Sequence, residues 1–277
     1  MIWILFRTKA AAPRAIILNV LMLKTLSPMQ ADYYSMNSVA WYLFDVAIIY
    51  AFFPFILRRL KRISRIPDAL WHMFAVYAIM FLTAFLSGLP EVPGTVSNNF
   101  VMWFTYICPL YRLGDFIIGC DLGFVFLARQ REEGPAASGR KRSVIFSIAE
   151  IGVILAIGLC LYIRQNNLLP MPEFFTRTLL WLPLSCALIY LFACSREGGG
   201  IVSAGLSRIR LLVFLGDISA YTFLVHSQIL HFCEAGIHTG GSATANSLVV
   251  IGAAFVFTQM AGYVAKLILE AKKNPPA

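Results

Sequence analysis

Charged residues are scarce in this 277-residue chain, in which Asp, Glu, Lys and Arg together make up 13% of the sequence. This share is about half of that found in soluble domains. Hydrophobic residues make up 59% of the chain, and the mean hydropathy is +0.73. The scarcity of charge excludes an ordinary soluble domain, and the composition predicts an all-α integral membrane protein.

The chain also lacks any C-x-x-C pair, and nearly all of its six cysteines lie inside apolar runs. This placement is typical of small buried hydrophobic residues, so neither a disulfide framework nor a metal site is predicted. The cysteines are Cys108, Cys120, Cys160, Cys186, Cys194 and Cys233.

A net charge of +9 does not indicate nucleic-acid binding here. The basic residues lie in short clusters between apolar runs, and no basic face with interleaved aromatic residues is present. Such clusters orient membrane helices, because Lys and Arg are enriched in cytoplasmic loops. The expected partner is therefore a lipid bilayer, and no nucleic-acid partner is expected.

Seven apolar runs reach the length of about 20 residues that a bilayer span requires. They lie at roughly 39–57, 70–88, 100–128, 143–163, 174–194, 211–233 and 246–268. The third run either forms a tilted span or begins in the outer interface at 103-WFTYICP-109, and 15-AIILNVLML-23 is a marginal eighth span. We therefore predict a single membrane domain over residues 1–277, a bundle of seven or eight helices with no soluble domain.

Basic and non-basic loops alternate along the chain if the run at 15–26 also crosses the bilayer. The basic clusters lie at 7–14, 58–65, 129–142, 196–210 and 266–273. Because Lys and Arg mark cytoplasmic loops, these clusters and the C-terminus are predicted to face the cytoplasm.

Acidic and basic residues inside apolar runs are candidates for function, since each is costly in hydrocarbon. Asp45 shares a helical side with Trp41, and no basic residue is near it in sequence, so its partner comes from another helix or it is protonated. Arg112 and Asp115 are spaced i,i+3 and can pair on one helical face. A functional site and a neutralised structural pair both remain open.

Two glycines follow this pair on roughly the same face. Gly119 and Gly123 lack a Cβ, so a neighbouring helix is expected to approach closely there.

The stretch 215-LGDISAYTFLVHSQILHF-232 is polar on two sides of its predicted helix. Asp217 and Tyr221 lie on one side and His226 lies roughly on the other, so neither side suits lipid and a central position is expected. A neutral histidine here can act as a base, as a proton donor or as a hydrogen-bonded packing residue.

The cluster that contains Arg58 and Arg59 is most simply a loop that sets membrane orientation. It can also attract an anionic cytoplasmic ligand, such as a nucleotide-bearing acyl donor, or lipid headgroups.

Three stretches carry a family resemblance. They are 36-MNSVAWYLFDVAIIYAFFPFILRRLKR-62, 109-PLYRLGDFIIGCDLG-123 and 215-LGDISAYTFLVHSQIL-230. In order and spacing they resemble the acyltransferase-3 family, multi-pass membrane enzymes typified by bacterial surface-polysaccharide O-acetyltransferases. The family patterns are N-x-x-x-W-x-L-x-x-E running into F-P and a basic loop, P-L-x-R-L-x-E-F-x-x-G-x-x-x-G, and L-G-x-x-S-Y-x-x-Y-L-x-H-x-P-x-L.

The chain departs from these patterns at several positions. Asp45 and Asp115 stand where the family usually has Glu, and Gln228 replaces a frequent Pro. The family's first span carries an Arg and, about ten residues on, a His assigned to catalysis, whereas the first histidine here is His72. The chain is therefore expected to correspond to the last seven or eight spans of such an enzyme, with MIWILF as the end of an earlier span. A separate chain could supply the spans that precede it.

The resemblance implies a bacterial inner-membrane enzyme that moves an acetyl or other acyl group to a hydroxyl of a surface glycan or lipid-linked sugar. Cytoplasmic acyl-CoA would be the co-substrate, with no bound cofactor. The candidate catalytic residues are His226, Arg112, Asp115 and Asp45. The candidate substrate-binding residues are Tyr221, Trp41, Arg58 and Arg59.

Two other functions remain open. One is a non-catalytic remnant or accessory membrane protein that keeps the fold. The other is a glycan or lipid transporter, although no inverted repeat or pair of Gly/Pro-broken helices supports it.

Overall fold

The computed structural model describes residues 13–88, 97–133, 140–194, 200–236, 248–253 and 255–256, and every regular element within these ranges is helical. The chain divides into two compact units. The first unit runs to Met36 and continues over Trp41–Leu206, and the second comprises Asn37–Ala40 and Ser207–Ala277. The all-helical prediction is thus confirmed for the described residues, and the single membrane domain over 1–277 stays a prediction.

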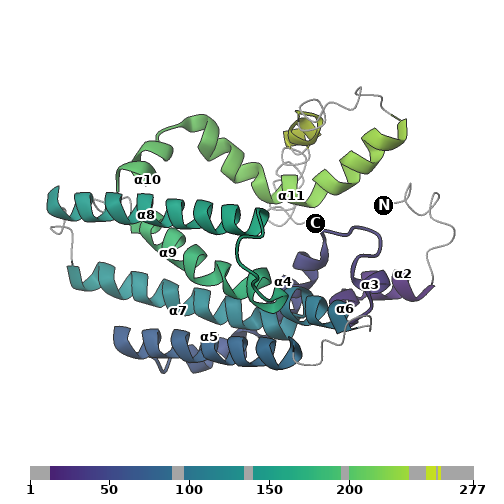
Figure 1. Cartoon of the computed structure of the whole chain (residues 1–277), viewed down its shortest axis with the longest axis horizontal. Helices are drawn as coiled ribbons and strands as arrows, with labels where there is room; N and C mark the ends of the chain where they lie inside the picture. Colours follow the sequence, from purple (N-terminus) through teal and green to yellow (C-terminus); the bar gives the residue numbers. More distant parts are fainter. Residues whose placement is uncertain are drawn as a thin grey trace, which may run out of the picture. The chain divides into compact units, whose positions relative to one another are not determined.

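The first unit contains a short N-terminal group of helices followed by longer ones (Figure 1). Its elements are α2 (Pro13–Val20), η1 (Lys24–Leu26), α3 (Gln30–Tyr33), α4 (Trp41–Leu60), α5 (Ile66–Gly88), α6 (Ser97–Met102), η2 (Trp103–Ile107), α7 (Pro109–Glu133), α8 (Arg140–Gln165), η3 (Phe175–Leu179), α9 (Trp181–Ala193) and α10 (Ile201–Leu206). Helix α7 packs against α4, α5 and α9, and α9 packs in turn against α8.

Three described helices are long and apolar enough to cross a membrane, at Ile66–Gly88, Ser143–Gln165 and Phe175–Ala193. They coincide with the runs predicted at 70–88, 143–163 and 174–194. Helices α4 and α11 (Arg210–Gly236) cover the runs predicted at 39–57 and 211–233, but they do not meet this measure of length and hydropathy. Most of the run at 246–268 lies outside the described residues, as does the C-terminus.

The predicted run at 100–128 is not one continuous helix. Helix α6 passes into the π-helix η2, Cys108 has an extended backbone (ψ 121°), and α7 begins at Pro109. Proline disfavours a helical conformation in the residue before it and suits the first position of a helix, where its missing N–H costs no hydrogen bond. Of the two predicted arrangements, the structure therefore favours a new helix after the WFTYICP segment.

The run at 15–26 also breaks within the described residues. Helix α2 ends at Val20, and Met22 has a left-handed backbone (φ 57°) that an L-residue rarely adopts. The chain then enters η1 instead of extending α2 to residue 26. This segment does not continue as a spanning helix, so the alternation of basic loops that depends on its crossing stays a prediction.

The core of the first unit lies where α5 meets α7 and η3. Buried side chains there are Met80, Ala84, Cys108, Tyr111, Ile118 and Leu179. The helices approach most closely at Gly114, where an added Cβ would overlap the thioether of Met80. A Cβ at Gly119 or Gly123 would meet no described atom within 4 Å, so the close approach predicted at those two glycines is wrong within the described residues.

Helix α10 is held at its N-terminus by α8. The backbone N–H groups of Val202 and Ser203 donate to Oε2 of Glu150 at 3.0 and 3.2 Å, and the Ser203 hydroxyl donates to Oε1. Glu150 is fully buried. A carboxylate at this position satisfies otherwise unpaired N–H groups and matches the positive end of the helix dipole. Glu150 therefore has a complete structural explanation.

We expect Gly200→Ala to destabilise the protein, because its Cβ would overlap the Glu150 carboxylate. Displacing that carboxylate from buried donors should lower the free energy of unfolding by about 1–3 kcal/mol. The matched control is Gly205→Ala, whose Cβ would meet nothing within 4 Å. Thermal unfolding in detergent measures both variants, and an equal effect of the two would contradict this account of Glu150.

The second unit is built on α11. The side chain of Asn37 donates to the carbonyl of Leu224 at 3.1 Å, and the hydroxyls of Ser38 and Ser227 lie 3.4 Å apart. Asn37 and Ser38, which precede α4, therefore contact the middle of α11, although Asn37 and Leu224 are 187 positions apart in sequence.

Candidate functional site

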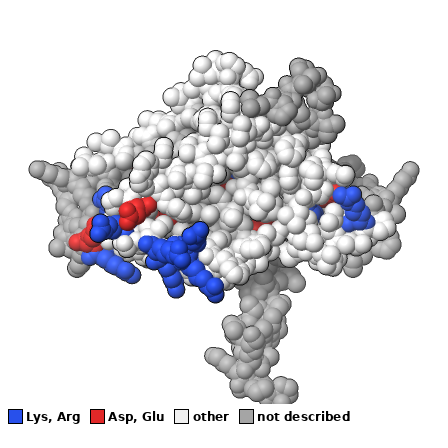
Figure 2. All heavy atoms as spheres, turned by 90° about the horizontal axis from the view of Figure 1, so that it is seen from below, with Lys and Arg blue, Asp and Glu red and all other residues white. Residues whose placement is uncertain are grey.

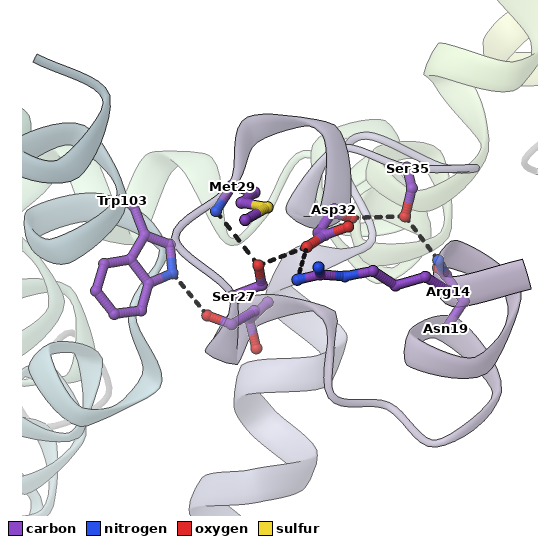
Figure 3. A network of polar contacts seen from close by, with 8 residues as sticks. Arg14, Asn19, Ser27, Met29, Asp32, Ser35 and Trp103 are labelled. Carbon is purple, nitrogen blue, oxygen red and sulfur yellow. Dashed lines mark hydrogen bonds and ion pairs between the residues drawn. The ribbon is translucent and has the colours of Figure 1, made fainter. Parts of the chain in front are cut away.

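The N-terminal group of helices forms a polar cap (residues 13–36) that is linked to η2 (Figure 3). Asp32 pairs with Arg14 at 2.8 Å and accepts a hydrogen bond from the Ser27 hydroxyl at 2.5 Å. The indole of Trp103 donates to the carbonyl of Thr25 at 2.8 Å. These contacts fix η1 beside η2 without requiring a long apolar helix.

The interior of the cap carries a buried cation. The ammonium of Lys24 donates to the carbonyl of Ser35 at 3.1 Å and lies 4.8 Å from the ring centroid of Phe44 on α4. Lys24 is fully buried, and this burial lowers the pKa of its ammonium to about 8 because desolvation disfavours the charged form.

The centre of the candidate site is the guanidinium of Arg112 on α7. Its Nη1 donates to Oδ2 of Asp115 at 2.7 Å, and its Nε donates to the carbonyl of Tyr106 at 2.8 Å. It lies 4.9 Å from the ring centroid of Tyr106 and 5.7 Å from that of Trp41. The predicted i,i+3 pair is therefore present, and two aromatic faces enclose its cation. We call these residues, together with Asp45, the Arg112 cluster.

Helix α4 contributes Trp41 and Asp45 to this cluster. The ring centroids of Trp41 and Tyr106 lie 5.0 Å apart, and Arg112 attracts Asp45 electrostatically. Asp45 and Trp41 were expected on one helical side, four residues apart, and both face the Arg112 cluster from α4. Arg112 is thus the cation from another helix that acts on Asp45, but no ion pair joins the two among the described residues, and the two predicted alternatives for Asp45 stay open.

Several polar atoms in the cluster and in the neighbouring η1 have no hydrogen-bond partner among the described residues. They are both carboxylate oxygens of Asp45, Oδ1 of Asp115 and the hydroxyl of Thr25. The hydroxyl of Thr25 lies close to the carboxylate of Asp45, but the geometry of the two groups is not that of a hydrogen bond. Because Asp45 is only 2% exposed, the absence of a hydrogen-bond partner for its carboxylate costs stability.

The other predicted residues lie elsewhere. Arg58 and Arg59 are exposed in the last turn of α4, a position that suits cations at the negative end of the helix dipole. Nδ1 of His226 lies 2.6 Å from the carbonyl of Phe223 on its own helix. His226 belongs to the second unit, and the side chain of Tyr221 lies outside the described residues.

Sequence reasoning missed one pair of ionisable residues. Nδ1 of His72 on α5 lies 2.7 Å from Oδ2 of Asp121 on α7, and Asp121 is 1% exposed. The separation of 49 positions between His72 and Asp121 hid the pair from sequence analysis. Among the described residues, no three His, Cys, Asp or Glu side chains converge as a metal site requires.

Comparison with known proteins adds no identification. No family model, curated protein or solved structure matches the chain. The acyltransferase-3 resemblance therefore rests on the three sequence stretches alone.

A double-mutant cycle tests how tightly the Arg112 cluster is coupled. Arg112→Met should lower the free energy of unfolding by about 3 kcal/mol, because it leaves the Asp115 carboxylate partly buried and unpaired. Arg112→Met with Asp115→Leu should cost less than the sum of the two single variants, because the second change removes the stranded charge. Unfolding in detergent provides the measurement, and strictly additive effects would contradict the coupling.

Proposed function

We propose that this protein is a membrane acyltransferase of the acyltransferase-3 type. It would move an acyl group from cytoplasmic acyl-CoA to a hydroxyl of a surface glycan or lipid-linked sugar. The observation that carries the proposal is the meeting of two resembling stretches at one cation. Trp41 and Asp45 come from the first stretch, Arg112 and Asp115 from the second, and all four belong to one cluster.

The chemistry of the Arg112 cluster suits such a reaction. Attack of a hydroxyl on a thioester develops negative charge on the carbonyl oxygen, and a fixed guanidinium can stabilise it. The unpaired carboxylate oxygens of Asp45 and Asp115 can accept hydrogen bonds from sugar hydroxyls. The rings of Trp41 and Tyr106 offer apolar faces of the kind on which a sugar ring packs.

The third resembling stretch lies in the second unit, and His226 remains a candidate for positioning or proton transfer. The exposed Arg58 and Arg59 suit the phosphates of the coenzyme A donor. A non-catalytic membrane protein would need the same cluster only for packing, and a transporter would need it only for binding. Acyl transfer therefore separates the three alternatives.

Membranes that contain the protein should transfer label from radiolabelled acetyl-CoA to glycan or lipid-linked sugar. Arg112→Lys should reduce that transfer about 100-fold, because an ammonium cannot reproduce the fork that joins Asp115 to the Tyr106 carbonyl. The matched control is Arg164→Lys, which changes an exposed arginine at the end of α8 and should leave transfer unchanged.

His226→Ala tests the third stretch in the same assay. Full activity in both Arg112→Lys and His226→Ala, at equal protein levels, would refute the assignment of these residues. Absence of transfer by the unaltered protein would favour the non-catalytic or transport alternatives.

A further inference from the structure

A second set of polar side chains lies beside the Arg112 cluster, where the π-helices η2 and η3 meet. The Thr178 hydroxyl on η3 donates to the carbonyl of Thr105 on η2 at 2.8 Å, and both residues are buried. This bond holds η3, which carries Arg177, against η2, which carries Tyr106. Single turns of π-helix are rare and are frequent at functional sites.

Two tyrosines at the end of α3 lie near the guanidinium of Arg177. The ring centroids of Tyr33 and Tyr34 are 4.6 Å apart, and Arg177 acts electrostatically on both phenols. Tyr106 also acts on the phenol of Tyr34. We call Arg177, Tyr33 and Tyr34 the Arg177 group. Because the ring centroid of Tyr106 lies 4.9 Å from the guanidinium of Arg112, Tyr106 borders both the Arg177 group and the Arg112 cluster.

The Arg177 group has hydrogen-bond donors that lack acceptors. The hydroxyl of the fully buried Tyr33 and the buried Nε–H of Arg177 have no partner among the described residues. The guanidinium pairs with the carboxylate of Glu173 through Nη2 at 2.7 Å. The side chain of Glu173 is 58% exposed, and an i,i+4 pair in contact with water contributes little, so the charge of Arg177 is only weakly neutralised.

The Arg112 cluster has the opposite deficiency. Its unpaired atoms are carboxylate oxygens of Asp45 and Asp115, which accept hydrogen bonds when ionised. Half-buried rings connect the two sets, namely Trp41 and Tyr106, whose centroids lie 5.0 Å apart, and Tyr34. A molecule with hydroxyl groups in one part and an anionic group in another complements both sets. An acidic saccharide has this combination, and its ring faces can pack on aromatic side chains.

The main group of exposed cations lies too far away to take part. Arg58, Arg59, Lys61, Arg62 and Arg65 are exposed at the end of α4 and in the turn that follows it. Along α4, Arg58 is about 25 Å from Trp41, which exceeds the Debye length of about 8 Å at physiological salt. Figure 2 shows Lys and Arg side chains gathered into groups on a face that is otherwise largely uncharged. An anion near Trp41 therefore gains little from the cations of this turn.

We propose that the Arg177 group is the subsite that binds an acidic group, a carboxylate or a phosphate, of the acceptor saccharide. The inference rests on the proposed function, because it names the class of acceptor. The guanidinium of Arg177 donates to the anion in charge-assisted hydrogen bonds, and hydroxyls of the same saccharide donate to the carboxylates of the Arg112 cluster. The acceptor is thus an acidic glycan or a lipid-linked sugar phosphate, and a neutral glycan binds more weakly.

Binding is measured first, because it requires no acyl transfer. The whole chain in phosphatidylcholine nanodiscs is titrated with cellobiose, cellobiouronic acid and cellobiose 1-phosphate, and tryptophan fluorescence reports binding. At least one acidic disaccharide should bind about tenfold more tightly than cellobiose, because only an anion forms charge-assisted hydrogen bonds with the guanidinium. The two acidic probes distinguish a carboxylate-bearing acceptor from a phosphate-bearing one.

Variants assign the preference to Arg177. Arg177→Gln should remove the preference for the acidic probe and leave the affinity for cellobiose unchanged. Glu173→Gln should raise the affinity for the acidic probe about threefold, because it frees the guanidinium, and a merely structural pair would give no such gain. The matched controls are Arg164→Gln and Glu132→Gln, two exposed residues of α8 and α7 that should change neither affinity.

Anionic lipid headgroups offer the same phosphate chemistry and are tested as competitors. In nanodiscs that also contain phosphatidylglycerol, the acidic probe should still bind more tightly to the unaltered protein than to Arg177→Gln. The surface charge of the lipid repels the probe equally from both proteins. Loss of the difference between them would show that a lipid headgroup occupies the Arg177 group, and would overturn the proposal.

Acyl transfer then tests the acceptor directly. With radiolabelled acetyl-CoA as donor and the acidic disaccharide as acceptor, Arg177→Gln should raise KM for the acceptor about tenfold with little change in kcat, since the lost contact lies away from the reacting hydroxyl.

The outcomes separate this inference from the proposed function. If the unaltered protein transfers label but binds cellobiose as tightly as both acidic probes, or if Arg177→Gln keeps the preference, the subsite is overturned and the proposed function stands. If the acidic probe binds through Arg177 and no acyl transfer occurs, the proposed function falls and the anion-binding subsite remains.

Discussion

The first unit depends on one requirement, that the largely buried guanidinium of Arg112 find partners for its N–H donors. The break between η2 and α7 helps to meet it. The end of a helix leaves carbonyl groups without intrahelical partners, and the Tyr106 carbonyl just before Cys108 accepts the Nε–H of Arg112. The proline that interrupts the helix and the arginine three residues later are therefore parts of one arrangement. An unbroken helix over 100–128 would have engaged that carbonyl in its own backbone bonds.

A second consequence follows from the packing of α5 on α7. Gly114 lets Met80 lie against the α7 backbone, which fixes the register of the two helices. Tyr111 supports the same register, because its hydroxyl donates to the Met80 carbonyl at 3.4 Å. About two turns along, this register brings His72 to Asp121. Small residues allow helices in membranes to approach closely. Here Gly114 sets the register in which Tyr111 contacts Met80 and Asp121 contacts His72.

Features that depend on neighbours in sequence were predictable. The helices over three apolar runs follow from composition and length, and the Arg112–Asp115 contact follows from i,i+3 spacing. Features that depend on distant partners were not. His72 and Asp121 lie in separate runs, and the sequence around Glu150 on α8 gave no sign that α10 would begin against this buried carboxylate.

Glycine illustrates the same limit. Gly119 and Gly123 had the expected spacing for close packing, but spacing alone does not reveal which glycine faces a neighbour. The neighbour of α7 is α5, and its contact falls at Gly114. The end of α2 at Val20 was hidden for a similar reason. The segment that follows it is held by a hydrogen bond from Trp103 to the carbonyl of Thr25, and these two residues are 78 positions apart.

Two buried carboxylates show how structural and functional charges differ in this protein. Glu150 accepts hydrogen bonds with both oxygens, from α10, and needs nothing further. Asp45 is 2% exposed, yet neither of its oxygens has a hydrogen-bond partner among the described residues, and Arg112, which acts on it electrostatically, is paired with Asp115. A protein gains nothing in stability from leaving such a group unpaired, since the desolvation cost remains without compensation. A hydrogen-bond donor on a substrate would supply that compensation under the proposed function, and protonation of Asp45 would reduce the cost without one. The proposed function therefore depends on the unpaired carboxylate of Asp45 in the Arg112 cluster, whereas the carboxylate of Glu150 is fully engaged in holding α10.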